Sequence, residues 1–267
     1  MSINRSNSVL QYDQSFVVNG YQLSGVNSVS VSYSVPLENS LVLGTSFGYN
    51  LNNPMQAEIS INRNLLYDDP LLNFTGDSSF SGSFSYNGQT YGFTSGFLTR
   101  YGVSCSVGDI PTVSCSITVY GKLEPSYQVL PFQTHPPLYI PSPRSILVSG
   151  NDTSTNRVKS FNYELNINRQ AIFSLDSFKD VDEVVFLPPI NISASVDFDA
   201  VNMTPDNYEA FLTGVANKFL DIKIKDRNSS NQLVNLVVPN IQEVSQELSA
   251  TAESQLTITN NYIGYLE

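Results

Sequence analysis

The chain has 267 residues, of which 41% are hydrophobic and 14% are charged, and its formal net charge is −11. This hydrophobic content excludes wholesale disorder. The excess of 24 acidic over 13 basic residues excludes tight binding to nucleic acid, because such binding neutralises phosphates with Lys and Arg. No apolar run approaches the ~20 residues of a membrane helix, and the first residues lack the apolar core of a secretory signal, so we expect neither feature.

The first fifty residues predict an extended arm at 1–20, then a strand, then an unusually apolar connection. Val29, Val31 and Tyr33 alternate with Ser residues, which is typical of a half-buried strand. Residues 36–54 are rich in Gly and Asn, yet they carry large apolar side chains that a solvated loop does not need. We therefore expect this segment to form a short strand pair or to lie on another surface. Its apolar side chains are Leu41, Val42, Leu43, Phe47 and Tyr49.

A strand, a short helix and two hairpins are predicted next. Apolar and polar residues alternate over 55–62. Asp69 as N-cap and Pro70 at the first helical position predict a short helix that ends near Gly76. Further strands are expected at 79–86 and 89–98, joined by Asn87-Gly88, and at 101–107 and 113–120.

Six prolines lie in residues 121–145, and proline cannot donate a hydrogen bond to a β-ladder. We therefore predict an extended linker between two β domains. The expected division is an arm at 1–20, a first domain at 21–121, a linker at 122–150 and a second domain at 151–267.

The second half of the chain repeats the order of the first. Thr204-Pro205 matches Asp69-Pro70, and an apolar stripe at helical spacing follows from Tyr208 to Phe219. The closing segments 114–121 and 254–261 are also similar. The same shift along the chain that relates Pro70 to Pro205 relates Met55, Ala57, Ile59 and Ile61 to Ile190, Ile192, Ala194 and Val196. The sequence thus predicts a mainly β protein with minor α content, built from two tandem β-sandwich modules that each carry a flanking helix.

Residues suited to catalysis are few. The chain has one histidine and no nucleophile elbow, phosphate-binding loop or metal-ligand spacing. Asp68-Asp69 and Asp180/Asp182/Glu183 are acidic pairs, and paired carboxylates could serve glycoside hydrolysis. We expect no enzymatic activity, no cofactor and no metal. Cys105 and Cys115 flank a predicted turn, and we expect buried free thiols, with a disulfide across the hairpin as the alternative.

The segments SGVNSVSVSYSVP (24–36) and YGVSCSVGDIPTVSCSITVYG (101–121), with the long connection, strand and helix between them, resemble the tail tube fold of long bacteriophage tails. The resemblance covers most of 20–121 and, more weakly, 155–264. In that family, six β-sandwich modules close a ring, a long loop reaches the neighbouring ring, and stacked rings enclose the DNA channel.

The resemblance implies a virion structural protein that is assembled in the host cytoplasm. Its rings would contain three chains, and the stacked tube would be a passive conduit for the genome, without specific DNA binding and without a membrane. Tape measure, baseplate and terminator proteins are the implied partners. The implied inter-ring contacts are Leu41, Val42, Leu43, Phe47 and Tyr49, with Phe178, Val184, Val185 and Phe186 in the second half. The residues expected to face the channel are Glu58, Asp197 and Asp199.

Three alternatives remain open at this point. The same module also suits another virion ring protein, from the distal tail, neck or baseplate. The tyrosine content suits a carbohydrate-binding or adhesin module, although the chain lacks tryptophan. The paired carboxylates suit a glycosidase.

Overall fold

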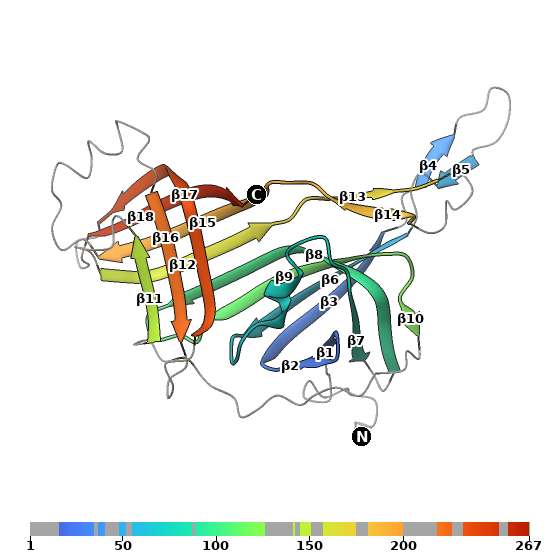
Figure 1. Ribbon diagram of the computed structural model, residues 1–267, viewed down its shortest axis with the longest axis horizontal. Helices are drawn as coiled ribbons and strands as arrows, with labels where there is room; N and C mark the ends of the chain where they lie inside the picture. Colours follow the sequence, from blue (N-terminus) through green and yellow to red (C-terminus); the bar gives the residue numbers. More distant parts are fainter. Residues whose placement is uncertain are drawn as a thin grey trace, which may run out of the picture.

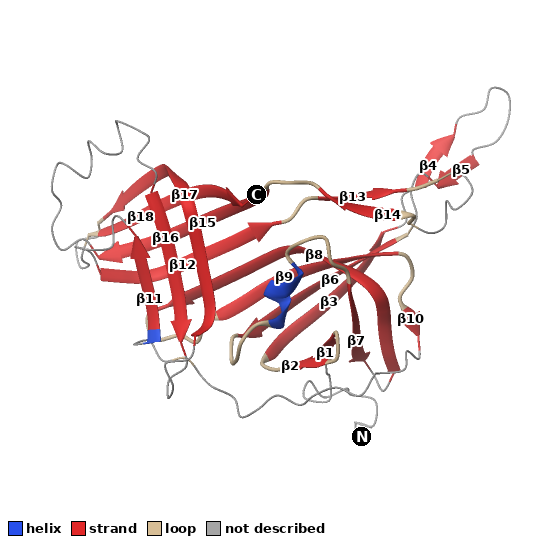
Figure 2. Ribbon diagram, in the orientation of Figure 1, coloured by secondary structure: helices blue, strands red, loops and turns tan. Residues whose placement is uncertain are grey.

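The computed structural model describes residues 16–34, 37–40, 48–51, 55–86, 89–125, 141, 145–150, 157–174, 181–199, 218–225, 232–250 and 256–266. Antiparallel strands form nearly all of the regular structure in these residues (Figures 1 and 2). The prediction of a mainly β protein is confirmed.

The first half contributes one set of strands to a 14-stranded sheet. Strand β8 pairs with β7 through its first half and with β9 through its second half. Beyond β9 follow β6 and β3, and beyond β7 follow β1 and β2. The strands are β1 (Phe16–Val18), β2 (Tyr21–Leu23), β3 (Val26–Ser34), β6 (Gln56–Asn64), β7 (Phe80–Tyr86), β8 (Gln89–Ser106), β9 (Thr112–Tyr120) and the short β10 (Glu124–Pro125), which pairs with β8.

The second half contributes a second set. Strand β17 pairs with β16 through its first half and with β18 through its second half. Beyond β18 follow β15 and β12, and beyond β16 follows β11. The strands are β11 (Ile146–Gly150), β12 (Arg157–Asn166), β15 (Ile190–Asp199), β16 (Lys218–Lys225), β17 (Gln232–Ser249) and β18 (Thr257–Leu266).

The order of pairing is the same in the two sets. Strands β1, β3, β6, β7, β8 and β9 of the first set match β11, β12, β15, β16, β17 and β18 of the second. Both β8 and β17 have 18 residues and change partners at a β-bulge. Because a bulge bends a strand, each long strand turns from one partner to another along its length, β8 from β7 to β9 and β17 from β16 to β18.

The two sets are joined edge to edge by β8 and β12 (Figure 1). Their antiparallel register runs from Ser160 opposite Ser106 to Asn166 opposite Arg100. A backbone hydrogen bond of 2.9 Å from Ile167 to the Thr99 carbonyl extends this joint. One hydrophobic core runs across it, from Ile59 and Tyr101 to Tyr163 and Val196.

A small hairpin is inserted at the same place in each set. The hairpin β4–β5 (Leu37–Ser40, Gly48–Leu51) lies between β3 and β6, and β13–β14 (Arg169–Ile172, Glu183–Phe186) lies between β12 and β15. Figure 1 shows both on the same side of the molecule, with β4–β5 projecting beyond the large sheet. The apolar connection predicted at 36–54 thus contains a short strand pair.

Several predicted elements differ from the structure. The strands expected at 89–98 and 101–107 are one continuous strand, β8. A bulge between Leu98 and Arg100, rather than a turn, lies between the two segments that the sequence predicts as separate strands. Residues 16–18 of the expected arm form the buried strand β1. The helix at Pro70 is a single 3-10 turn, Pro70–Phe74, capped by Asp69 as predicted.

The second predicted helix follows Pro205 and falls mainly on 205–217, which lie outside the described residues. Phe219, the last member of its apolar stripe, lies on strand β16. Most of the proline-rich segment, 126–140, also lies outside the described residues.

Candidate functional site

One polar face extends across both sets of strands, on the side opposite the core. It follows the order β3, β6, β9, β8, β12, β15, β18 and the second half of β17. Along β6, β9 and β15, buried and more exposed residues alternate strictly. The side chains on this face are mainly Ser, Thr and Asn, as in Ser28, Ser30, Ser32 and Ser34 of β3.

The few charged groups on this polar face are mostly acidic. Glu58 is exposed on β6, and Asp197 and Asp199 are half-buried on β15, so the three residues predicted to face the channel share one face. Glu164 and Glu247 lie on the same face, together with the basic residues Arg100 and Arg157 of the ladder. This face therefore carries a negative charge and offers little to hold a phosphate backbone.

Two ion pairs cross strands on or beside this face. The Arg100 guanidinium lies 2.5 Å from a Glu164 carboxylate oxygen, across the β8–β12 joint. This hydrogen bond holds the pKa of Glu164 below its ordinary value. Lys159, at a bulge in β12, lies 3.0 Å from Asp199. Because these groups are partly exposed, each pair contributes at most about 1 kcal/mol to stability.

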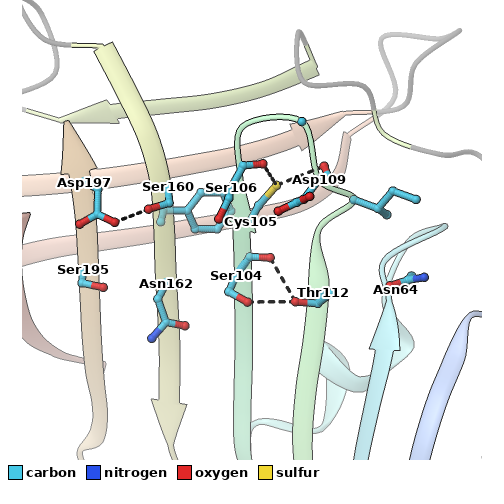
Figure 3. Close-up of a pocket in the computed structure, with 13 residues that line it drawn as sticks. Asn64, Ser104, Cys105, Ser106, Asp109, Thr112, Ser160, Asn162, Ser195 and Asp197 are labelled. Atoms are coloured by element: carbon cyan, nitrogen blue, oxygen red, sulfur yellow. Dashed lines mark hydrogen bonds between the residues drawn. The ribbon is translucent and has the colours of Figure 1, made fainter. Parts of the chain in front are cut away.

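A depression of about 670 Å³ lies on the polar face at the joint, near the turn between β8 and β9 (Figure 3). The Ser104 and Thr112 hydroxyl oxygens are 2.9 Å apart. Ser160 donates to Asp197, and Thr259 donates to the other Asp197 oxygen at 2.6 Å. These polar groups satisfy one another. The alternation of the sequence places them on one face, but their partners depend on the cross-strand register.

The two cysteines are buried and free. Cys105 lies on β8, with its thiol directed towards the Ser106 and Asp109 carbonyl oxygens, and Cys115 lies on β9 opposite Tyr101. Burial raises the pKa of Cys105 to about 11 and that of Cys115 to about 12. Both thiols are therefore protonated at neutral pH and poorly reactive.

A buried charged cluster fastens the 3-10 turn to the core. The side chains of Arg63 and Asp69 are fully buried and form an ion pair. Asp69 also accepts hydrogen bonds from the Leu71 amide (3.0 Å) and the Tyr101 hydroxyl (2.7 Å). Burial raises the pKa of Tyr101 well above its ordinary value, and the Asp69 carboxylate adds to the rise. The sequence identifies Asp69 as a helix cap but does not identify Arg63 as its ion-pair partner. The available signal for Arg63 is its position on the core-facing side of β6.

Two strand edges of the polar sheet have one partner each in the part of the chain that the structure describes. Strand β3 pairs with β6, and the second half of β17 pairs with β18. Apolar side chains lie along both edges: Tyr33 on β3 and Leu248 on β17 are exposed, and Val31 is half-buried. Such edges attract another strand.

The predicted inter-ring residues fall in or near the two small hairpins. Tyr49 lies on β5, and Val184, Val185 and Phe186 lie on β14, where they are half-buried. Phe186 packs against the core, so it is partly covered within its own chain. Leu41, Val42, Leu43, Phe47 and Phe178 lie outside the described residues.

Arg169, at the base of β13–β14, anchors that hairpin to the first half of the chain. Its guanidinium donates to the Leu98 carbonyl at 3.0 Å and to the Gly76 carbonyl at 2.6 Å, and it lies 5.2 Å from the centre of the Phe97 ring. The base of this hairpin is therefore held to the first half of the chain.

Within the described residues, no helix is long and apolar enough to cross a membrane, and no cluster of His, Cys, Asp and Glu is arranged to hold a metal ion. No protein-family model matches the chain, and no curated protein matches it with significant similarity.

Proposed function

We propose that this chain is a non-enzymatic structural protein that assembles with copies of itself into stacked rings, as the tail tube of a long-tailed bacteriophage does. The observation that carries the proposal is the repeated pairing order, in which two matching sets of strands join edge to edge at β8 and β12. A unit that joins to its own copy within a chain is suited to join to further copies between chains.

The register supports two tandem copies of one module in residue-level detail. The pairing of β3 with β6 shifts at Asn27, and the matching pairing of β12 with β15 shifts at the equivalent position, Lys159. The pairing of β8 with β9 shifts at Thr99, and the matching pairing of β17 with β18 shifts at the equivalent position, Val244. Since bulges are retained as built-in features of a fold, two matched bulges favour duplication over chance similarity of β proteins.

Ring closure would use the two edges of the polar sheet that have one partner each among the described residues, β3 and the second half of β17. The edge of β17 and the edge of β3 are the counterparts of β8 and β12. A contact between two different surfaces of identical subunits is heterologous, and it closes a ring when the rotation permits. By the resemblance, three chains supply the six modules of one ring.

The polar face suits the wall of the channel. Its side chains are mainly Ser, Thr and Asn, and its carboxylates, among them Glu58, Asp197 and Asp199, outnumber its basic groups. Of the basic groups, Arg100 is paired with Glu164, Lys159 is paired with Asp199, and Arg157 lies opposite Asp199. Screening limits the repulsion of DNA to about 8 Å at physiological salt. The genome then passes without specific binding, and the tape measure protein occupies the same channel during assembly.

The two small hairpins suit the contacts between rings. They occur at matching places in the two modules and lie on the same side of the molecule (Figure 1). Their apolar residues, including Leu41, Val42 and Leu43, then find burial on the neighbouring ring. Baseplate and terminator proteins would meet the two ends of the stack.

Negative-stain electron microscopy of the purified protein tests this function. We expect rings or hollow tubes of uniform width, with a sedimentation coefficient that rises with protein concentration. Rings that never stack, together with a low copy number in virions, would instead favour a distal tail, neck or baseplate ring protein. A protein that stays monomeric at millimolar concentration would contradict both assignments.

A further inference from the structure

The β8–β12 joint within the chain serves as the template for a contact between chains, because it shows how two such strands pair. In β8–β12, the core-facing residues Val103 and Tyr163 lie opposite each other, and both are buried, with 1% and 2% of their surfaces exposed. The two strands run antiparallel and continue the polar face without interruption. The template therefore specifies a partner strand, a direction and a register.

The matching registers of the two sets relate residues of β12 to residues of β3, and residues of β8 to residues of β17. Tyr163 of β12 lies opposite Ala194 of β15, as Val31 of β3 lies opposite Ile59 of β6, so Tyr163 corresponds to Val31. The pairings of β8 with β9 and of β17 with β18 relate Val103 to Leu248 in the same way.

We infer that β17 of one copy pairs antiparallel with β3 of the next copy, with Val31 opposite Leu248. The same register places Ser32 opposite Glu247 and Tyr33 opposite Gln246. This inference rests on the proposed ring and deepens it, because it names the strands and the register that close the ring.

Burial of the edge side chains supports this register. Tyr33 is 51% exposed and Leu248 is 48% exposed, whereas their counterparts Leu165 and Val103 are 3% and 1% exposed. Pairing β3 with β17 gives these side chains the neighbours that their counterparts have in the internal joint. The removal of this apolar area from water favours association.

The charges on the two edges are compatible with the register. Glu247 faces Ser32, and no like charges lie directly opposite each other, which would be destabilising. The internal pair Arg100–Glu164 has no equivalent between copies, because Ser245 and Ser32 occupy the corresponding positions. The contact between copies therefore depends on backbone pairing and apolar burial, and we expect this strand contact to respond little to salt.

Disulfide cross-linking tests the register. Val31→Cys and Leu248→Cys chains are co-expressed with different tags, and the assembled particles are oxidised with copper-phenanthroline. Directly opposed residues in an antiparallel pair lie about 4.5–5.5 Å apart between Cα atoms, within the range of a disulfide. A second pair, Ser32→Cys with Glu247→Cys, covers the neighbouring position, so that one of the two pairs is of the closer, non-hydrogen-bonded type.

Three controls make the result specific. Tyr33→Cys with Ala250→Cys is displaced from the inferred register by roughly 13 Å along the strand, and should not cross-link. Each single variant alone should show no more cross-linking than the wild type, whose own thiols are buried. Circular dichroism verifies that each variant is folded, which we expect because these edge positions are exposed or half-buried.

In a head-to-tail ring of equal amounts of the two chains, a neighbour carries the matching cysteine half of the time. We therefore expect up to about half of the chains to form mixed dimers in at least one of the two opposed pairs, and a chain carrying both Val31→Cys and Leu248→Cys to form closed covalent rings. Rings or tubes without cross-links in either pair, or with cross-links in the displaced pair, would overturn the register and leave the ring function standing. Homodimers of the Val31→Cys chain alone would also overturn it, because β3 would then pair with itself. A wild-type protein without any assembly would overturn the function itself.

Discussion

At the scale of single residues, Asp69 has two roles that the sequence does not show together. It caps the 3-10 turn through the Leu71 amide, as its position before Pro70 predicts. It also neutralises the buried Arg63 and accepts a hydrogen bond from Tyr101. The second role dominates energetically, because an unpaired buried charge costs more than a lost cap.

Asp69→Ala should therefore lower the free energy of unfolding by about 3–5 kcal/mol, since it leaves the Arg63 guanidinium buried without a partner. Urea denaturation of dilute protein measures this loss. The neighbouring Asp68 is exposed, so Asp68→Ala provides a matched control that should stay within about 0.5 kcal/mol of the wild type. Equal effects of the two substitutions would show that the Arg63–Asp69 pair contributes nothing to stability.

At the scale of elements, each half is organised by one long bent strand. The bend of β8 brings the Phe93 ring between two glycines, and a Cβ atom added at Gly82 or Gly96 would lie 2.4 Å from that ring. The corresponding residues of the second half are Leu220, Val238 and Ile241. The first half thus fills the space at the bend of its long strand with one large ring between two glycines. The second half fills the corresponding space with three aliphatic side chains.

This exchange predicts an energetic coupling between Gly96 and Phe93. Gly96→Ala alone should destabilise the protein by about 1–3 kcal/mol through overpacking. Combined with Phe93→Val, it should cost less than the sum of the two single substitutions by about 1 kcal/mol or more, because the smaller side chain leaves room for the methyl group. A double-mutant cycle of urea unfolding measures the coupling.

Gly76→Ala is the matched control for this cycle, because a Cβ atom at Gly76 meets nothing within 4 Å. It should neither destabilise the protein strongly nor couple to Phe93. Strict additivity of Gly96→Ala and Phe93→Val would mean that the ring moves away from the added methyl group, and that the two glycines are not required by packing.

At the scale of the whole molecule, growth of a tube needs two independent contacts. In our proposal, edge pairing closes a ring and the small hairpins contact a neighbouring ring. The two contacts use different residues, so they are separable by substitution.

Replacing Leu41, Val42 and Leu43 together with Ser should abolish stacking while rings still form. The loss follows from the removal of apolar groups that are buried only on another ring in our proposal. Electron microscopy separates single rings from tubes, and the unfolding free energy of dilute protein should change by less than about 1 kcal/mol. A large loss of stability would instead place these side chains in the core of their own chain.

Much of the architecture follows from local patterns in the sequence. The period of two in Val29–Tyr33 and in 55–62 identifies strands β3 and β6 and their buried faces, since side chains alternate across a strand. The alignment of Ile61 with Val196 agrees with the registers of β6 and β15. The similarity of 114–121 to 254–261, by contrast, misaligns the closing strands: it matches Cys115 to Gln255, whereas the pairing relates Cys115 to Asn260.

Alternation, caps and turns are properties of adjacent residues, so the strands, the capped turn at Pro70 and the repeat can be derived without coordinates. The partners of each strand cannot, because pairing depends on residues far apart in the chain. The continuity of β8 through a bulge, the burial of Arg63 against Asp69, and the β8–β12 joint all depend on these long-range contacts. Within the described residues, that joint leaves β3 and the second half of β17 as the edges of the polar sheet with one partner each, and these are the edges where we propose that another copy binds.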